Sequence, residues 1–211
     1  METKCYYKIE NNIDFVWRIR EIKDDPYRKG ESIAEHFVGN TKQFVRWIVK
    51  NEKDLKERNL LEGYQEIGNN AVYDEVLGLL RKDEKFPVIY GFRQILGLEK
   101  IARIEFENTI EIRSVRDLFQ KAINIDKVIG DKIINIGFEY YKKLWETDEY
   151  FSEPNLNTIE KFKPTIELQS VNFYDDIKSG NVTYYFRPSW DEEHGLHIKF
   201  NLNSLTGEVD N

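Results

Sequence analysis

The segment from 125 to 145 carries the strongest periodic pattern in the chain, and it restricts which folds the rest can join. Its apolar side chains recur every three or four residues, at Ile129, Ile133, Ile136, Tyr140 and Leu144. This spacing places them on one face of an α-helix. Gly130 and Gly137 lie seven residues apart, so they occupy nearly the same side of that helix. Each glycine costs a helix about 1 kcal/mol relative to alanine, so the pair predicts close packing against a neighbouring element.

The C-terminal region shows the two-residue period of β-strands instead. Ile166 and Leu168 alternate with polar residues, and the phase then shifts to Val171 and Phe173. Such a shift predicts a β-bulge. Two further strands are predicted by the same period, through Val182, Tyr184 and Phe186 and through Leu196, Ile198, Phe200 and Leu202. Because turn-forming residues separate these runs, we expect an antiparallel meander packed on the helices.

The first two-thirds of the chain favours helices after one or two N-terminal strands. Alternation over 5–22, with a turn at Asn11-Asn12, predicts the strands. A helix beginning at Thr41 is predicted by a capping residue and an apolar stripe, namely Asn40 followed by Phe44, Trp47, Ile48 and Leu55. A second helix is predicted after Asn69-Asn70 from Val72, Val76, Leu79 and Leu80. Segment 86–112 fits a helix or a hairpin, and we favour the helix because its flanks are predicted helical.

These patterns predict an α+β protein with a mainly helical body, N-terminal strands and a C-terminal antiparallel β meander. We place the body at 1–150 and the meander at 151–211, packed together as one globular unit. The single cysteine, Cys5, can form no internal disulfide, and no local partner would activate its thiol. The N-terminus has no apolar signal region, and no apolar run approaches the length of a membrane span. We therefore expect a cytoplasmic protein without a membrane partner.

Negative charge is confined to the C-terminal third. Residues 146–211 carry five basic and thirteen acidic residues, whereas residues 1–145 carry 26 basic and 25 acidic residues. Charge that gathers in one region is a candidate binding face, while evenly spread charge mostly serves solubility. The overall net charge of −7 argues against direct nucleic-acid binding, which depends on clustered lysine and arginine.

The same region holds the one motif-like string of the chain, Trp190-Asp191-Glu192-Glu193-His194-Gly195-Leu196-His197. Its pattern W-D-x-E-H-G-L resembles a strand–loop–strand signature near the C-terminus of a group of uncharacterised bacterial domains. Some of these domains are associated with polymorphic-toxin immunity proteins. The similarity covers about 20–40 residues and implies a bacterial protein of the immunity type. The resemblance carries no catalytic activity over to this chain, because the group offers no activity that could be transferred.

Three interpretations of this loop remain open. In the first, the loop is structural: Trp190 covers the edge of the sheet, Asp191 accepts backbone N–H bonds, and Gly195 supplies a positive φ angle. In the second, it belongs to a protein-binding face formed by Asp175, Asp176, Tyr185, Asp191, Glu192 and Glu193. The two loops of that face lie at opposite ends of the middle strand if both hairpins are tight. In the third, a metal or hydrolytic site uses Asp191, His194 and His197.

Of the functions compatible with these features, we favour a non-enzymatic protein-binding protein without a cofactor. In its sharpest form, it is an immunity protein that neutralises a basic toxin through the acidic C-terminal face. The alternative is a small metal-dependent hydrolase or metal-binding protein that uses Asp191, His194 and His197. A third possibility is a structural subunit that contacts a larger assembly through exposed aromatics such as Tyr185. His36 is interpreted as a packed or capping histidine rather than a catalytic base.

Overall fold

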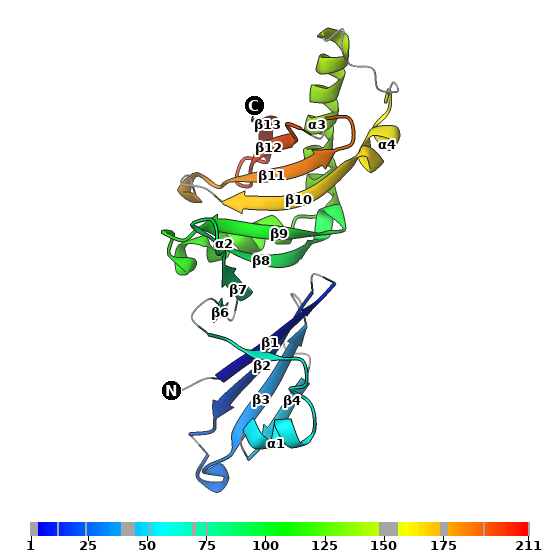
Figure 1. Cartoon of the computed structure of the whole chain (residues 1–211). Coiled ribbons are helices and arrows are strands. Elements are labelled where there is room, and N and C mark those ends of the chain that lie inside the picture. The colour runs from blue at the N-terminus through cyan, green and yellow to red at the C-terminus, as the bar shows by residue number, and fades with distance from the viewer. Residues whose placement is uncertain are drawn as a thin grey trace. The chain divides into compact units, whose positions relative to one another are not determined.

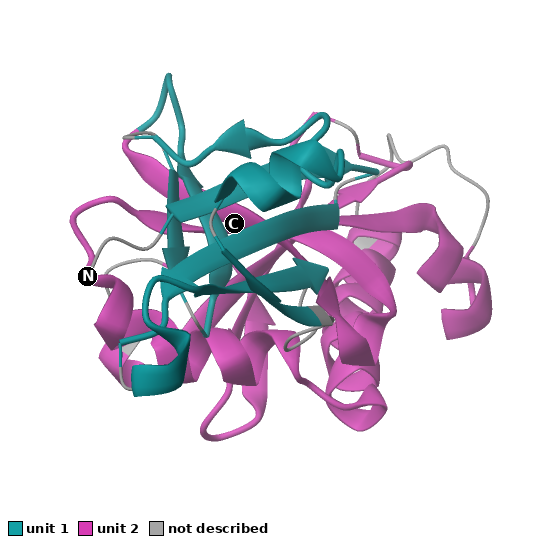
Figure 2. Cartoon of the chain, turned by 90° about the horizontal axis from the view of Figure 1, so that it is seen from below, with its two compact units in different colours: residues 1–86 teal, residues 87–211 magenta. Residues whose placement is uncertain are grey.

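The computed structural model describes residues 4–11, 13–23, 25–38, 45–50, 52–68, 71–74, 76–147, 156–173, 177–191 and 193–210 (Figure 1). Strand outweighs helix in this part of the chain, 44% against 29%. The prediction of an α+β protein with a mainly helical body is therefore wrong, and the protein is β-rich. The chain divides into two compact units, residues 1–86 and 87–211 (Figure 2). No helix in the described ranges is long and apolar enough to cross a membrane.

Unit 1 is built on an antiparallel sheet whose described strands follow the order β4-β3-β2-β1-β5. Their bounds are β1 Lys4–Glu10, β2 Ile13–Glu21, β3 Ser32–Val38, β4 Val45–Val49 and β5 Gln65–Glu66. The short helices are η1 Pro26–Arg28 and α1 Glu52–Glu57, and a hairpin follows, made of β6 Ala71–Asp74 and β7 Gly78–Lys82. The first two strands and their turn at Asn11 confirm the prediction for 5–22.

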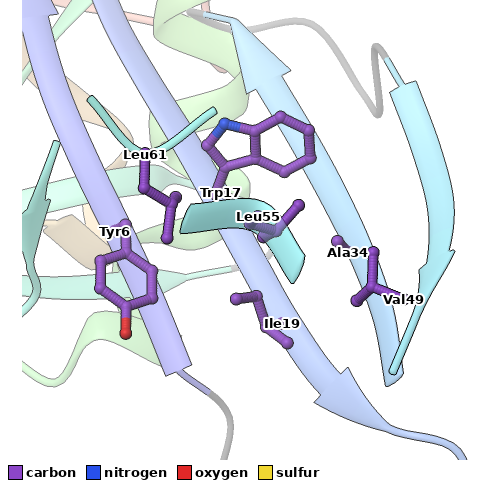
Figure 3. Packing of buried hydrophobic residues seen from close by; sticks show 7 residues of the cluster. All are labelled: Tyr6, Trp17, Ile19, Ala34, Val49, Leu55 and Leu61. Atoms are coloured by element: carbon purple, nitrogen blue, oxygen red, sulfur yellow. The ribbon is translucent and has the colours of Figure 1, made fainter. Parts of the chain in front are cut away.

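The core of unit 1 lies on one face of this sheet, beneath α1. The buried cluster consists of Tyr6, Trp17, Ile19, Ala34, Val49, Leu55 and Leu61 (Figure 3). Tyr6 lies opposite Trp17, and residues that oppose each other on neighbouring strands point to the same face. Leu55 is the buried residue of α1, and it packs onto the cluster from the side of that helix. Burying an apolar side chain of this size stabilises the fold by about 1.5–3 kcal/mol.

Both helices predicted in the first 80 residues are corrected by the structure. Val45–Val49 is a strand, and the helix begins only at Glu52, while Asn40, Thr41 and Phe44 lie outside the described residues. The second predicted helix is the hairpin of β6 and β7. Its turn is held by the carboxylate of Asp74, which accepts from the backbone N–H groups of Val76 and Leu77 at 2.9 and 3.0 Å. Asx turns of this kind compete with helix formation.

Unit 2 contains a mixed sheet, covered by helices on one face. Its described strands follow the order β13-β12-β11-β10-β9-β8, and only the pairing of β9 with β10 is parallel. The strand bounds are β8 Val88–Ile95, β9 Lys100–Glu107, β10 Ile166–Phe173, β11 Asn181–Pro188, β12 Leu196–Asn201 and β13 Thr206–Val209. The helix bounds are η2 Leu96–Leu98, α2 Ile112–Ile123, α3 Lys127–Thr147, α4 Ile159–Phe162, η3 Lys163–Thr165 and η4 Ile177–Ser179. Helices α2 and α3 connect the two parallel strands, as a parallel crossover requires.

The long helix is confirmed as α3, and its two glycines mark close contacts. A Cβ atom on Gly130 would lie 2.2 Å from the carbonyl oxygen of Gly97, just before β9. On Gly137 it would lie 2.9 Å from a methyl carbon of Leu196 on β12. The glycines therefore let α3 approach both the η2 turn and the sheet.

Segment 86–112 is a hairpin, so the preference for a helix there is wrong. Strands β8 and β9 pair antiparallel, and the chain reverses at η2, where Glu99 adopts a φ of 53°. The buried residues of β9 alternate, which is the period of a strand with one covered face. The C-terminal meander is confirmed, including a register shift between Leu168 and Ser170. It contains one more strand than predicted, β13.

Candidate functional site

Part of the predicted site lies at one end of the unit 2 sheet, where the loop 189–195 joins β11 to β12. Tyr185 on β11 lies opposite His197 on β12, and their rings meet edge to face with centroids 4.7 Å apart. In the loop, Glu193 and His194 are exposed and Asp191 is half-buried. We name Tyr185, Asp191, Glu193, His194 and His197 the β11–β12 surface. Whether this surface binds a partner stays a prediction.

Trp190 anchors this loop to the body of unit 2. Its side chain is buried, and its ring lies 5.1 Å from that of Tyr141 on α3 and 6.2 Å from that of Phe162 on α4. Aromatic pairs at such distances add about 0.5–1.5 kcal/mol beyond the burial of their surface. Trp190 therefore has a structural role, but it packs against α3 and α4 and does not cover the edge of the sheet as the first interpretation expected.

Asp191 and Gly195 fix the shape of the loop. The carboxylate of Asp191 accepts from the backbone N–H of His194 at 3.2 Å and lies 2.9 Å from Nδ1 of the same histidine. Gly195 has a φ of 77°, which disfavours any side chain. A Cβ atom there would also lie 2.5 Å from the ring of Tyr185. Both positions confirm the structural interpretation, and they hold Tyr185 and His194 in a defined arrangement.

The electrostatics of the loop favour a charged His194. The hydrogen bond and the negative charge of Asp191 raise the pKa of His194 above its ordinary value, and Glu193 contributes in the same direction. The side chain of His194 is 80% exposed, so it stays in contact with solvent and with any docking partner. The surface thus carries two carboxylates and a histidine whose charge responds to pH.

The geometry does not favour a metal ion at Asp191, His194 and His197. Nδ1 of His194 is engaged by Asp191, and His197 contacts the ring of Tyr185 rather than the loop. Within the ranges that the structure describes, no three histidine, cysteine or acidic side chains converge to hold a metal. Structural and catalytic zinc sites need three or four convergent ligands.

The other predicted acidic residues cannot be placed on this surface. Asp175, Asp176 and Glu192 lie outside the described residues. The connection that contains Asp175 and Asp176 precedes β11, whereas the loop 189–195 follows it. A strand of eight residues spans about 25 Å at roughly 3.3 Å per residue. The two connections therefore join opposite ends of β11.

Unit 1 contains a pocket that the sequence did not reveal. Its volume is about 460 Å³, and its lining residues are Lys8, Trp17, His36, Trp47, Asn59, Leu60, Glu62 and Tyr64. The imidazole of His36 stacks on the indole of Trp17 with centroids 4.5 Å apart. Trp47, on β4, stands beside Trp17 at 5.7 Å and remains partly exposed. We name this cavity the aromatic pocket.

One hydrogen bond lies in the wall of the aromatic pocket. The Tyr64 oxygen lies 2.9 Å from Nε2 of His36. Burial, and secondarily the charge of Lys8, lower the pKa of His36, so this ring is neutral at pH 7. Burial raises the pKa of Tyr64 to about 12, so its hydroxyl keeps its proton at pH 7. The tautomer of His36 decides which of the two groups donates.

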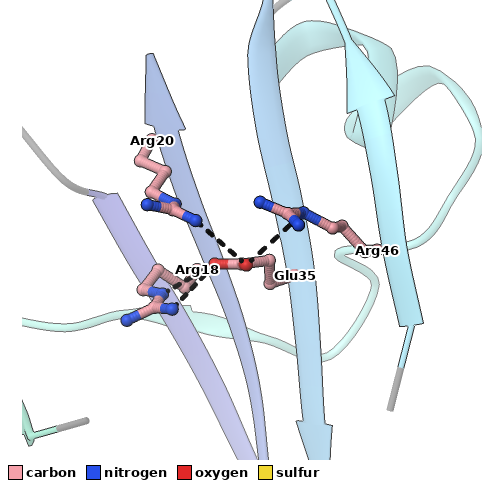
Figure 4. Close-up of polar contacts among 4 residues, drawn as sticks. All are labelled: Arg18, Arg20, Glu35 and Arg46. Carbon is pink, nitrogen blue, oxygen red and sulfur yellow. Dashed lines mark hydrogen bonds and ion pairs between the residues drawn. The ribbon is translucent and has the colours of Figure 1, made fainter. Parts of the chain in front are cut away.

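The opposite face of the same sheet carries a buried carboxylate among arginines. Glu35 on β3 is contacted by Arg18 at 2.8 Å, Arg20 at 3.4 Å and Arg46 at 3.7 Å (Figure 4). Arg18 also lies over the rings of Phe37 and Tyr73. One carboxylate among three guanidinium groups leaves a surplus of two positive charges. We name these four residues, Arg18, Arg20, Glu35 and Arg46, the arginine cluster.

The fold and the site define a β-rich protein of two units, with an exposed histidine–carboxylate loop on the second. A protein-family model described as a domain of unknown function, DUF6985, matches residues 92–209. This match covers more than half of the chain, so the protein belongs to the DUF6985 family. The matched region includes the β11–β12 surface and leaves the aromatic pocket outside. No curated protein and no solved structure matches the chain.

Proposed function

We propose that this protein is a non-enzymatic protein-binding protein whose β11–β12 surface contacts a basic partner. The observation that carries the proposal is the joint placement of an aromatic pair and two carboxylates at one exposed end of the sheet. Tyr185 and His197 offer ring surface, and tyrosine is enriched among the residues that dominate binding energy. Asp191 and Glu193 add two carboxylates in the loop whose Gly195 lies against the Tyr185 ring.

The described residues of the loop suit recognition because contacts within unit 2 hold them in place. Trp190, Asp191 and Gly195 fix its conformation through the contacts described above. A preformed surface loses little conformational entropy on binding. The acidic excess of the C-terminal third supports the basic character of the partner, since complementary charge accelerates association and rejects like-charged proteins. In the finer form of the proposal, the partner is a basic toxin and the protein neutralises it.

The test compares two variants that change the net charge equally. In the first, Glu192→Lys and Glu193→Lys alter the loop, and Asp191 is kept because it holds the backbone of His194. In the control, Glu139→Lys and Glu146→Lys alter exposed positions on α3. Each chain is immobilised and exposed to a lysate of its natural host at low and at physiological salt.

We expect a basic protein to be retained by the natural chain and by the α3 control, and lost by the loop variant at physiological salt. If the loop variant retained the basic protein equally well, the loop would not be part of the interface. Capture of no basic protein at either salt would contradict the proposal. Stoichiometric metal in the natural chain that is absent from a His194→Ala variant would favour the metal-binding alternative instead.

A further inference from the structure

Strand β4 forms an open edge of the unit 1 sheet. It pairs on one side with β3, from Ser32 opposite Val49 to His36 opposite Val45. Among the described residues, no strand pairs with its other side. An exposed edge presents a row of backbone N–H and C=O groups to which another extended chain can bind. Proteins often protect such edges with proline or charged side chains, and the sequence Val45-Arg46-Trp47-Ile48-Val49 contains no proline and one charged residue, Arg46.

Large apolar side chains remain exposed on both faces of this edge. Trp47 is 36% exposed and Ile48 is 46% exposed. Neighbouring residues of a strand point to opposite faces, so Trp47 lies on the side of the aromatic pocket and Ile48 on the side of the arginine cluster. A residue placed opposite Trp47 on an added strand would share its face and lie at the mouth of the aromatic pocket.

The arginine cluster determines the charge of the occupant. Arg46 belongs to β4 itself, and its side chain is half exposed (Figure 4). Arg20 is 40% exposed, whereas Glu35, their shared partner, is 4% exposed. The negative charge is therefore buried while part of the positive charge faces solvent. Guanidinium groups bind carboxylates with charge-assisted hydrogen bonds, so acidic side chains on an added strand would be favoured next to Arg46.

We propose that β4 binds an extended acidic segment of a partner protein as an additional strand of the unit 1 sheet. An apolar or aromatic side chain of that segment lies against Trp47 at the aromatic pocket, and acidic side chains on the other face lie beside Arg46 and Arg20. A second copy of this chain fits less well, because pairing β4 with β4 would bring two positively charged arginine clusters to the same seam. This interaction uses unit 1 and is independent of the function proposed for the β11–β12 surface.

The test uses a fluorescein-labelled peptide in which glutamate alternates with valine and a central phenylalanine takes one apolar position. A matched peptide replaces every glutamate with lysine. Binding to the full chain is measured by fluorescence anisotropy. We expect the acidic peptide to bind with a Kd below about 1 mM and the lysine peptide to bind at least about tenfold more weakly. No binding of the acidic peptide up to about 1 mM would overturn the proposal.

Variants of the chain then localise the contact. We expect Arg46→Glu and Trp47→Ala each to lower the affinity for the acidic peptide by about tenfold or more. Two controls, Arg28→Glu on η1 and Lys53→Glu on α1, are expected to leave the affinity unchanged, because both positions lie off the edge of β4. Loss of binding with Lys53→Glu but not with Arg46→Glu would place the peptide on the lysines near α1 and overturn the proposal.

Backbone pairing is tested with two N-methylated versions of the acidic peptide, one for each set of alternate residues. An added strand directs only one set of its N–H groups toward β4, so we expect one methylated peptide to lose binding and the other to retain it. Equal binding of both would show a contact through side chains alone and would contradict strand addition. A concentration-dependent dimer abolished by Trp47→Ala, seen by sedimentation, would assign the edge to a second copy instead.

Discussion

At the scale of single residues, the contact of Gly130 with Gly97 predicts a substitution that the sequence would misjudge. Alanine is the better helix former by about 1 kcal/mol. However, its Cβ atom would lie 2.2 Å from the carbonyl oxygen of Gly97, which is backbone and cannot rotate away. We expect Gly130→Ala to lower the free energy of unfolding by about 1–3 kcal/mol, as overpacking typically does.

Urea denaturation followed by circular dichroism measures this change. Gly68→Ala is the matched control, because a Cβ atom at Gly68 meets nothing within 4 Å and its φ angle is not positive. We expect that control to be neutral or slightly stabilising. If Gly130→Ala also stabilised the chain, the close approach of α3 to the η2 turn would be refuted.

His194 provides a second prediction at this scale. Its pKa is raised in the folded protein, chiefly by Asp191. A raised pKa means that the folded state binds the proton more tightly than the unfolded state does. The resulting stabilisation is fully present below the unfolded pKa of about 6.5 and is lost as the pH rises through the folded value. We expect an NMR titration to give His194 a higher pKa than an unfolded histidine.

The control for that titration is Asp191→Asn, which keeps the shape of the side chain and removes its charge. We expect the pKa of His194 to fall in this variant, because the hydrogen bond and the charge of Asp191 are the main causes of its rise. An unchanged His194 titration would show that the 2.9 Å contact with Asp191 does not persist in solution.

At the scale of elements, β3 depends on the charge at Glu35. Glu35→Gln would remove the carboxylate that pairs with Arg18, whose side chain is nearly buried. Removing one partner of a buried ion pair costs about 3–5 kcal/mol. Because Arg20 and Arg46 remain partly solvated, we expect a smaller loss of about 2–3 kcal/mol in the free energy of unfolding, measured by urea denaturation. The control, Asp25→Asn, breaks an exposed pair with Arg28, and it should change stability by less than about 1 kcal/mol.

The apolar pattern of each element explains which elements the sequence predicts well. Helix α3 was predicted because apolar residues recur along it every three or four positions. Strand β4 was mistaken for a helix because it is apolar on both faces: Trp47 and Ile48 are adjacent, and with Leu55 they imitate a helical stripe. In β9, the alternation of Ile104 and Phe106 was the correct signal. It was outweighed by the flanking predictions, of which the helix before the segment was wrong and the helix after it was correct.

At the scale of the whole molecule, the two candidate sites differ in how far apart their residues lie in the chain. The β11–β12 surface comes from a single strand–loop–strand segment, so a local motif was enough to find most of it. The aromatic pocket combines Lys8, Trp17, His36, Trp47 and Tyr64 from four strands and a turn. Their meeting depends on the register of the unit 1 sheet, and no spacing in the sequence encodes that register.

The distribution of charge over the chain leads to the last prediction, which concerns the rate of association with the basic partner proposed above. Charge attracts over about one Debye length, which is roughly 30 Å at 0.01 M ionic strength and 8 Å at 0.15 M. The excess of acidic residues in the C-terminal third should therefore accelerate encounter most strongly at low salt. We expect the association rate constant, measured by stopped-flow fluorescence, to fall by about tenfold or more over this range. The dissociation rate should change much less, because it depends on short-range contacts such as that of Tyr185.

Glu192→Lys with Glu193→Lys should slow association and flatten its salt dependence, whereas the α3 control should retain most of the salt dependence. Equal slopes for the two variants would mean that the net charge of the chain, rather than the loop beside Tyr185, guides the partner.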